Sequence, residues 1–419
     1  MDKYLISGGK RLYGDFFVQG AKNAVLPLFA ASILTKERVV IDNCPSLLDV
    51  TNMANILESL GATVTREGNY VEINPKNADN IEIPGSLAKE LRSSIFLLGS
   101  ILGRQRCAKI AYPGGCDIGL RPIDIHLKGL ETLNVDIKDQ NGYIYCDATK
   151  IRGGNVVLDY PSVGATENVM MAAVTAKGTT IINNAAREPE IVELQQFLNA
   201  MGAKVKGAGS SIISIEGVSS LHGAEYTTMP DRIVAGTMLI CAAMCGGSVT
   251  VHNCRSNHIQ ALISKLQQSS CKLDIFSDRI ELVSTGRLFS IESIETQPYP
   301  GFPTDLQAPI MAMQAVSCGT SIITENIFET RFKHVPELIK MGAKIKVSSR
   351  SAFVRGVPRL VGTNILAEDL RGGACLVLAG LKAEGTTEIS NISHIDRGYE
   401  NWEHQLTALG ADITRRSNN

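Results

Sequence analysis

The sequence of 419 residues has no long apolar run. Its longest uncharged, mostly apolar stretch covers residues 233–245, whereas a helix that crosses a bilayer needs about 20 such residues. The first residues, Met1–Leu5, also lack the apolar core of a signal peptide. We therefore expect a cytoplasmic protein that does not bind a membrane.

Patterns typical of metal and redox sites are missing as well. None of the ten cysteines belongs to a Cys-x-x-Cys pair, and no group of cysteines and histidines has the spacing of a zinc site. Most of the cysteines should therefore be reduced, buried and apolar in character.

The chain has almost no net charge. A formal net charge of −1 argues against a general binder of nucleic acid or membrane surfaces. The sequence also contains no P-loop, dinucleotide fingerprint or kinase signature. An anionic ligand would therefore need positive charges that are gathered locally.

One pattern recurs along the whole chain: a helix end, a residue that tolerates a left-handed backbone, and a strand. Its copies lie at 57–64, 130–137, 198–205, 266–273, 338–345 and 406–413. The turn residue is glycine in four copies and Asn134 in the second, while the fourth copy has lost its Gly-Ala pair. Copies about seventy residues apart indicate a repeat architecture.

Each repeat predicts an α/β unit with short strands and about two helices. In several repeats Gly-Thr or Gly-Ser also precedes a β-branched strand, as at 178–182, 247–251, 319–323 and 385–389. Because 419 residues exceed what one core usually supports, we expect two domains of three units each. Ligands would bind in a cleft between two such domains.

Two glycine-rich segments offer candidate reactive groups. Lys22 follows Gly20, and it can supply a point charge to a phosphate group. Cys116 follows two glycines in a loop that is a poor place for a core thiol, and Arg121 would favour its thiolate. Asp117 opposes the thiolate, which suits a thiol that donates a proton. A surface lysine and an inert cysteine are the alternatives.

Asp305 stands on a turn that Pro300 and Pro303 stiffen. One interpretation is a general base on a rigid loop. The other is that Thr304 or Asp305 caps a helix that begins near Leu306.

Four arginines recur in glycine-rich or loop-like settings of different repeats: Arg92, Arg331, Arg371 and Arg397. If they converge, they can bind an anion with two or three charges. Surface positions or ordinary salt bridges are the alternative for each of them.

The chain resembles the UDP-N-acetylglucosamine enolpyruvyl transferase (1-carboxyvinyltransferase) family over essentially its whole length. The motifs that carry the resemblance lie at 21–23, 113–116, 121–124, 162–168, 186–190, 230–232, 302–305, 331 with 334–337, 369–371 and 394–399. The resemblance implies an inside-out α/β barrel with two domains of three units. The domains would comprise 22–229 and 1–21 with 230–419.

The resemblance also implies roles for individual residues. The catalytic residues would be Cys116, Asp305, Lys22 and Arg397. Phosphoenolpyruvate would be bound by Lys22, Asn23, Arg92, Arg121, Arg331, Arg371 and Arg397. The nucleotide sugar would contact Asn23, Arg92, Arg121, Pro122, Ile123, Asp124, Ile125, Ser162, Val163, Gly164, Asp305 and Ile327.

The family transfers the enolpyruvyl group of phosphoenolpyruvate to the 3-hydroxyl of UDP-N-acetylglucosamine and releases phosphate, the first committed step of peptidoglycan synthesis. Asp305 would take the hydroxyl proton. Cys116 would protonate the methylene carbon, and fosfomycin would alkylate it. Addition followed by elimination requires an acid, a base and dense positive charge. The resemblance implies no metal, no organic cofactor and a monomer whose lobes close on the ligand.

Three features depart from the family pattern. Asp117 stands where a small neutral residue is usual, and we expect it to raise the pKa of Cys116. Val234 stands where glutamate is usual, and the fourth repeat lacks its Gly-Ala pair. These last two should affect packing more than chemistry.

Three other functions are open to this sequence. An enolpyruvylshikimate-phosphate-type synthase shares the fold, although the Gly-Gly-Cys loop and the Arg-Pro-Ile-Asp motif argue against it. A non-catalytic paralogue could bind the nucleotide sugar as a sensor, although Lys22, Cys116, Asp305 and Arg397 are all present. A purely structural repeat protein would not need arginines in so many glycine-flanked loops.

Overall fold

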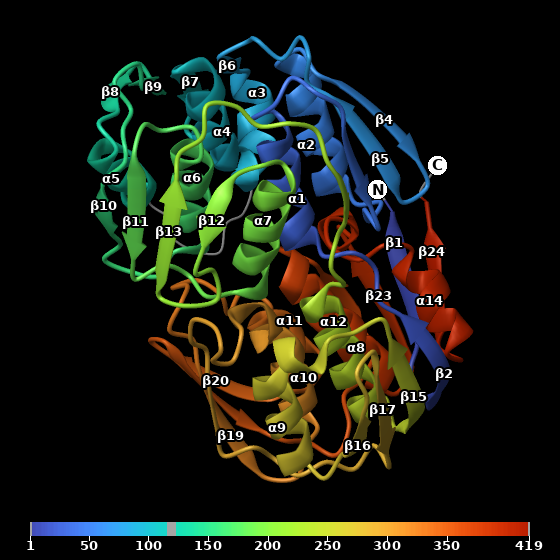
Figure 1. Ribbon diagram of the computed structural model, residues 1–419. Helices are drawn as coiled ribbons and strands as arrows, with labels where there is room; N and C mark the ends of the chain where they lie inside the picture. Colours follow the sequence, from blue (N-terminus) through green and yellow to red (C-terminus); the bar gives the residue numbers. More distant parts are fainter. Residues whose placement is uncertain (1, 115–122, 418–419) are drawn as a thin grey trace. The chain divides into compact units, whose positions relative to one another are not determined.

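The structure is a computed structural model that describes residues 2–114 and 123–417, and these form two compact units (Figure 1). The first, called the N unit, comprises residues 20–114 and 123–229. The second, called the C unit, comprises residues 2–19 and 230–417. Cys116, Asp117, Arg121 and Pro122 lie outside the described residues.

The described strands form six four-stranded sheets, three in each unit. The strands of the N unit are β3 (Val39–Asp42), β4 (Thr63–Glu67), β5 (Tyr70–Asn74), β6 (Glu82–Ile83), β7 (Cys107–Ala111), β8 (Asp136–Gln140), β9 (Tyr143–Asp147), β10 (Asn155–Val157), β11 (Thr179–Asn183), β12 (Lys204–Lys206), β13 (Ile212–Glu216) and β14 (Glu225–Thr227). They are ordered β14-β3-β5-β4, β6-β7-β9-β8 and β10-β11-β13-β12. Each sheet thus joins an antiparallel three-stranded part to one parallel edge strand.

The C unit repeats this arrangement. Its strands are β1 (Lys3–Ser7), β2 (Leu12–Phe17), β15 (Gly247–His252), β16 (Lys272–Ile275), β17 (Arg279–Ser284), β18 (Ser293–Glu295), β19 (Thr320–Thr324), β20 (Lys344–Ser348), β21 (Ser351–Arg355), β22 (Asn364–Leu366), β23 (Thr386–Ser390) and β24 (Asp412–Arg416). They are ordered β16-β17-β15-β2, β18-β19-β21-β20 and β22-β23-β1-β24. The first strand of the chain therefore lies between two of the last (Figure 1).

Each unit has seven α-helices among the described residues, and three in each unit are more completely buried than the rest. The helices of the N unit are α1 (Lys22–Ser32), α2 (Leu48–Ser59), α3 (Gly85–Glu90), α4 (Phe96–Gln105), α5 (Asp124–Thr132), α6 (Val163–Ala173) and α7 (Pro189–Ala200), with the 3-10 helix η1 (Arg92–Ile95). Those of the C unit are α8 (Arg232–Cys245), α9 (Gln260–Gln268), α10 (Gln307–Ala315), α11 (Val335–Lys340), α12 (Leu370–Lys382), α13 (Ser393–Asp396) and α14 (Trp402–Ala408), with η2 (Ser256–His258) and η3 (Thr304–Leu306). Helices α4 and α6 pack together in the first unit, and α8, α10 and α12 in the second.

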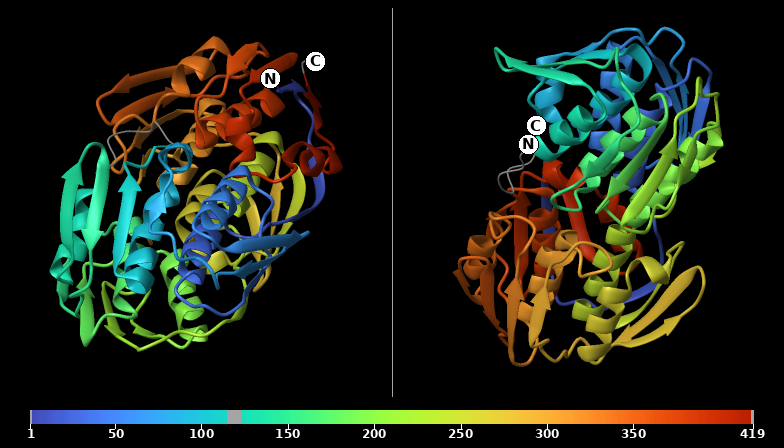
Figure 2. Two further views of the ribbon diagram at one scale, coloured as in Figure 1. Left: turned by 90° about the horizontal axis from the view of Figure 1, so that it is seen from above. Right: turned by 60° about the vertical axis from the view of Figure 1, so that its left-hand side comes forward.

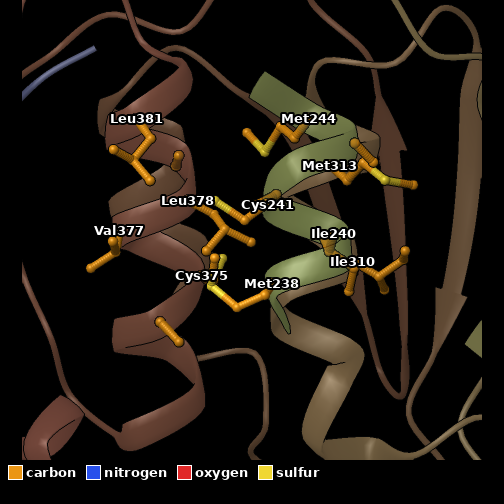
Figure 3. Packing of buried hydrophobic residues seen from close by; sticks show 14 of the residues in the cluster. Met238, Ile240, Cys241, Met244, Ile310, Met313, Cys375, Val377, Leu378 and Leu381 are labelled. Carbon is orange, nitrogen blue, oxygen red and sulfur yellow. The ribbon is translucent and has the colours of Figure 1, made fainter. Parts of the chain in front are cut away.

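The sheets surround these helices within each unit (Figure 2). Figure 3 shows the centre of the C unit, where Met238 and Cys241 of α8 lie near Cys375 and Leu378 of α12. These side chains are fully buried, and burial raises the pKa of the Cys375 thiol. The thiols therefore act as apolar packing groups, as the sequence predicted.

The predicted turn conformation is confirmed in all six repeats. The backbone is left-handed at Gly61, Asn134, Gly202, Ser270, Gly342 and Gly410, with φ between 68° and 104°. Ser270 keeps this conformation although its repeat has lost the Gly-Ala pair. The turn is therefore dictated by the helix end and the following strand, and glycine only makes it easier.

Two further expectations concern apolar segments. Val234 is buried in α8, so this departure from the family pattern belongs to the core. In residues 2–114 and 123–417, no helix has both the length and the apolarity that a membrane crossing requires.

Candidate active site

Asp305 lies between two buried arginines. It belongs to η3, and its carboxylate accepts a hydrogen bond from Nη2 of Arg331 at 2.8 Å on one oxygen. Nη2 and Nε of Arg371 donate to the other oxygen at 2.9 and 3.2 Å. Arg331 is 4% exposed and Arg371 is 3% exposed. The alternative of surface arginines is therefore wrong for both.

The helix-capping interpretation of this turn is also wrong. Neither η3 nor α10 has a side-chain cap. Asp305 binds the arginines instead, and the hydroxyl of Thr304 donates to Glu325 at 2.9 Å. Both side chains thus point to other parts of the unit.

The arginines set the charge state of Asp305. Burial alone would raise its pKa, but the charges of Arg371 and Arg331 and their hydrogen bonds hold the pKa well below its usual range. Asp305 is therefore a carboxylate at any physiological pH. While both arginines hold it, it is also a weak base.

Arg371 is held at several points. It is the second residue of α12, where Asp369 caps the helix by accepting from the backbone N–H groups of Arg371 and Gly372 at 3.0 and 2.8 Å. Its Nη1 donates to the hydroxyl of Tyr399 at 3.3 Å. That hydroxyl also shares a hydrogen bond with Thr237 of α8 at 2.9 Å. The guanidinium is therefore fixed in position without any ligand.

Tyr399 is itself tightly placed. Its ring stacks on Trp402, with centroids 4.2 Å apart. Burial raises the pKa of Tyr399 although Arg371 opposes this, so the phenol stays protonated. Arg397, two residues earlier, is half-buried and follows α13. Tyr399 thus connects Arg371 to the segment that contains Arg397.

The N unit contains the candidate lysine. Lys22 begins α1, is only 9% exposed, and its Nζ lies 2.6 Å from a carboxylate oxygen of Asp49 in α2. The alternative of a solvated lysine is therefore wrong. Asn23 is the next residue of the same helix. Arg92 donates through Nη1 to the carbonyl of Pro113 at 3.4 Å, which places it beside the start of the Gly-Gly-Cys segment.

The residues predicted to contact the nucleotide sugar occupy two helix starts of the N unit. Ile123, Asp124 and Ile125 are at the start of α5, and Ser162, Val163 and Gly164 are at the start of α6, where Ser162 is the cap. A Cβ atom on Gly164 would lie 2.9 Å from Cε1 of His126. The two helix starts therefore lie side by side.

His126 of α5 is held by Asn168 of α6. Its Nδ1 lies 2.7 Å from the amide nitrogen of Asn168. Asn168 also donates to the carbonyl of Ile95 at 2.9 Å and accepts from the N–H of Gly99 at 2.7 Å. One buried amide thus ties α4, α5 and α6 together.

Of the predicted site residues, the structure brings three into direct contact with one another, and three others lie outside the described residues: Cys116, Arg121 and Pro122. Asp305, Arg331 and Arg371 form one network in the C unit. Ile327 lies in the same unit, and its N–H donates to Glu325 at 2.8 Å. Sequence reasoning did not find Asp49, Glu325 or the contact of Tyr399 with Arg371. Their side-chain partners are more than twenty residues away in sequence, so no local spacing pointed to them.

Comparison with known proteins connects these features to a family. A family model described as EPSP synthase (3-phosphoshikimate 1-carboxyvinyltransferase) matches residues 6–406. UDP-N-acetylglucosamine 1-carboxyvinyltransferase 2 of Caldanaerobacter subterraneus subsp. tengcongensis is 52% identical over 99% of this chain and 100% of its own. UDP-N-acetylglucosamine 1-carboxyvinyltransferase of Halothermothrix orenii is 48% identical over 99% of this chain and 100% of its own.

The chain belongs to the UDP-N-acetylglucosamine 1-carboxyvinyltransferase family. Among solved structures, the enolpyruvyl transferase NikO from Streptomyces tendae matches with a TM-score of 0.89, covering 100% of this chain and 99% of that one. At 23% identity this likeness shows the fold alone. For this member of the UDP-N-acetylglucosamine 1-carboxyvinyltransferase family, the predicted α/β fold with six repeats is confirmed.

Proposed function

We propose that the chain transfers the enolpyruvyl group of phosphoenolpyruvate to the 3-hydroxyl of UDP-N-acetylglucosamine and releases phosphate, a step of peptidoglycan synthesis. The observation that carries this proposal is the carboxylate of Asp305 between the buried guanidinium groups of Arg331 and Arg371. It offers a base and two anion-binding groups in one place. Identity of about half with 1-carboxyvinyltransferases over their full length favours the nucleotide sugar over a shikimate phosphate.

The arginines bind anionic phosphoenolpyruvate. Each guanidinium has several N–H donors, and Asp305 occupies only one or two of them. When a phosphate or carboxylate of the substrate binds the same guanidinium groups, it competes with Asp305 for their charge. The pKa of Asp305 then rises toward its ordinary value, and the carboxylate becomes a better base.

Proton transfer can then follow substrate binding. Asp305 takes the proton of the sugar 3-hydroxyl while the hydroxyl oxygen attacks C2 of phosphoenolpyruvate, and an acid protonates C3. Loss of a proton from C3 and of phosphate from C2 completes the transfer. We assign the acid to Cys116, Asp305 being the base. Lys22 and Arg397 are assigned to the phosphate, whose developing charge they stabilise.

The nucleotide sugar is assigned to the two neighbouring helix starts of the N unit, together with Asp305 and Ile327. The exposed backbone N–H groups at the starts of α5 and α6 favour anionic phosphate groups. Gly164 lets the rings of His126 and Phe96 pack directly against the start of α6. Pro122 and Arg121 belong to the same proposed contact set.

Release of phosphate from phosphoenolpyruvate tests the proposal. The release should require UDP-N-acetylglucosamine and should not occur with shikimate 3-phosphate. Fosfomycin should abolish it, and Cys116→Ser should abolish the inactivation by fosfomycin. Binding of the nucleotide sugar without any release of phosphate would instead favour a non-catalytic paralogue. The cytoplasmic location, the monomeric state and the domains 22–229 and 1–21 with 230–419 stay predictions.

A further inference from the structure

Glu325 is a buried carboxylate that accepts four hydrogen bonds. It follows β19 directly and is 1% exposed. One oxygen accepts from the hydroxyl of Thr296 at 2.8 Å and from the N–H groups of Ile327 and Phe328 at 2.8 and 3.1 Å. The other oxygen accepts from the hydroxyl of Thr304 at 2.9 Å. Four donors converge on it from three separate segments of the C unit.

The other repeats show what the fold itself needs at this position. In four of them the residue after the corresponding strand is an asparagine, and in three of these four its amide donates to the carbonyl of the residue that follows the parallel neighbouring strand. The pairs are Asn43 with Thr228 at 2.8 Å, Asn184 with Leu158 at 2.8 Å and Asn253 with Val18 at 2.9 Å. The fifth repeat has a charged acceptor instead, which the repeat geometry does not require.

The donors of Glu325 belong to the two segments that flank the candidate base. Thr304 is the residue before Asp305 in η3. Ile327 and Phe328 precede Arg331, and the ring of Phe328 lies 5.3 Å from the Arg331 guanidinium carbon. Arg331 in turn binds Asp305 at 2.8 Å. Glu325 therefore contacts both neighbours of the Asp305 carboxylate: the preceding residue, Thr304, and, through Phe328, Arg331.

We propose that Glu325 is a positioning residue: it holds Asp305 and Ile327 in the positions in which both contact the nucleotide sugar. This proposal rests on the proposed function. The two backbone N–H groups can only donate, and both hydroxyl groups donate here, so a carboxylate satisfies all four partners. A glutamine would turn its amide N–H₂ either toward the backbone N–H groups, which cannot accept, or toward the hydroxyl of Thr304, whose hydrogen bond would have to reverse. The change would leave the volume of the side chain almost unaltered.

The first test compares Glu325→Gln with Glu337→Gln. Glu337 is also buried in the C unit. It accepts from the N–H of Leu366 at 3.1 Å and from Lys340 at 2.6 Å, and both partners lie outside η3, which contains Asp305. Glu325→Gln should lower kcat and raise KM for UDP-N-acetylglucosamine, with kcat/KM for that substrate falling about 10- to 100-fold. KM for phosphoenolpyruvate should change less than about twofold in both variants, because Arg371 keeps its other contacts. Glu337→Gln should lower thermal stability without this split.

The second test is a double-mutant cycle with Thr304→Val, which removes one hydroxyl donor to Glu325. If Glu325 acts on Asp305 through Thr304, Thr304→Val lowers kcat in the wild-type protein. In the Glu325→Gln variant the same substitution then lowers kcat only a little further. Fully additive effects on kcat would overturn the proposal, as would a Glu325→Gln enzyme with wild-type kinetic constants. If the wild-type protein itself releases no phosphate, the proposed function fails. This outcome differs from the two that overturn the role of Glu325, because both of those require an active wild-type enzyme.

Discussion

Arg371 reaches Asp305 from the start of α12 and binds a single carboxylate oxygen through two nitrogens, at 2.9 and 3.2 Å. Arg331 takes the other oxygen, so one negative charge is shared between two buried positive charges. Without a substrate, the proposed base is thus also the counter-ion of the two arginines that we propose as the anion site. Chemistry and stability are coupled at this residue.

Asp305→Asn should therefore impair both. Loss of the base should reduce kcat by about 10²- to 10⁴-fold. Loss of the negative charge leaves two buried arginines facing each other without their shared counter-ion, which should cost about 3–5 kcal/mol in the free energy of unfolding. Phosphate release and urea unfolding measure the two effects. Added phosphate should restore part of the stability, because it supplies the missing charge. A variant as stable as the wild type would contradict this coupling.

Tyr399→Phe should weaken the binding of phosphoenolpyruvate. The variant keeps the stack on Trp402 but loses the hydrogen bond that Arg371 makes to the phenol at 3.3 Å. We expect KM for phosphoenolpyruvate to rise about 3- to 10-fold, because a hydrogen bond to a charged group is worth about 1 kcal/mol or more. Steady-state kinetics with either substrate varied will show this.

Tyr4→Phe is the matched control for that variant. Tyr4 is also buried in the C unit, and its hydroxyl donates to Glu403 at 2.9 Å. This change should lower stability and leave KM unchanged. If KM for phosphoenolpyruvate is the same in Tyr399→Phe as in Tyr4→Phe, Tyr399 only stabilises the fold.

Gly164→Ala should weaken the binding of the nucleotide sugar. The new Cβ would lie 2.9 Å from Cε1 of His126 in α5 and 3.0 Å from Cε1 of Phe96 in α4, so both rings must move away from the start of α6. We expect KM for UDP-N-acetylglucosamine to rise about tenfold while KM for phosphoenolpyruvate stays constant. Gly85→Ala, whose Cβ would make only an ordinary 3.4 Å contact with Tyr143, is the control. Parallel increases in both KM values would refute the assignment.

The stability of the protein should depend on the charge of His334. Burial lowers its pKa to about 4, since the charge of Asp369, which opposes this, does not compensate. Between pH 6.5 and 4 the imidazole of His334 is therefore protonated in the unfolded chain but neutral in the folded protein. The free energy of unfolding falls as the pH falls through this range. His334→Gln should remove roughly 3 kcal/mol of this loss, because each tenfold change in proton affinity is worth about 1.4 kcal/mol.

Urea unfolding at several pH values between 4 and 7 measures that dependence. His404→Gln changes an exposed histidine and should retain the wild-type slope. If His334→Gln also retains it, folding does not lower the pKa of His334, and this histidine is not the cause of the pH dependence.

Much of the fold could be predicted because its signals are local. A helix end followed by a left-handed residue and a strand needs only a few neighbouring residues, so all six turns were found, including the one at Ser270. The apolar run 233–245 is too short to cross a membrane, and it forms most of the buried helix α8. The β-branched strands followed from their Gly-Thr or Gly-Ser starts.

The site was less predictable because its contacts are long-range. The turn at Thr304 and Asp305 has a typical helix-capping sequence, but Glu325 and the two arginines compete successfully for both side chains. Asp49 carries no distinguishing motif, and only its 2.6 Å contact with Lys22 singles it out. Such pairings join residues that are distant in sequence, and composition and spacing do not reveal them.

The position of β1 between β23 and β24 has a consequence for synthesis on the ribosome. Residues 20–229 are continuous and hold all the strands of their own three sheets. The C unit, in contrast, needs the first strands of the chain and the last one at 412–416. At about 5–20 residues per second, β1 and β2 must wait some tens of seconds for their partners. These nascent strands are thus the part of the chain that a chaperone would have most reason to bind.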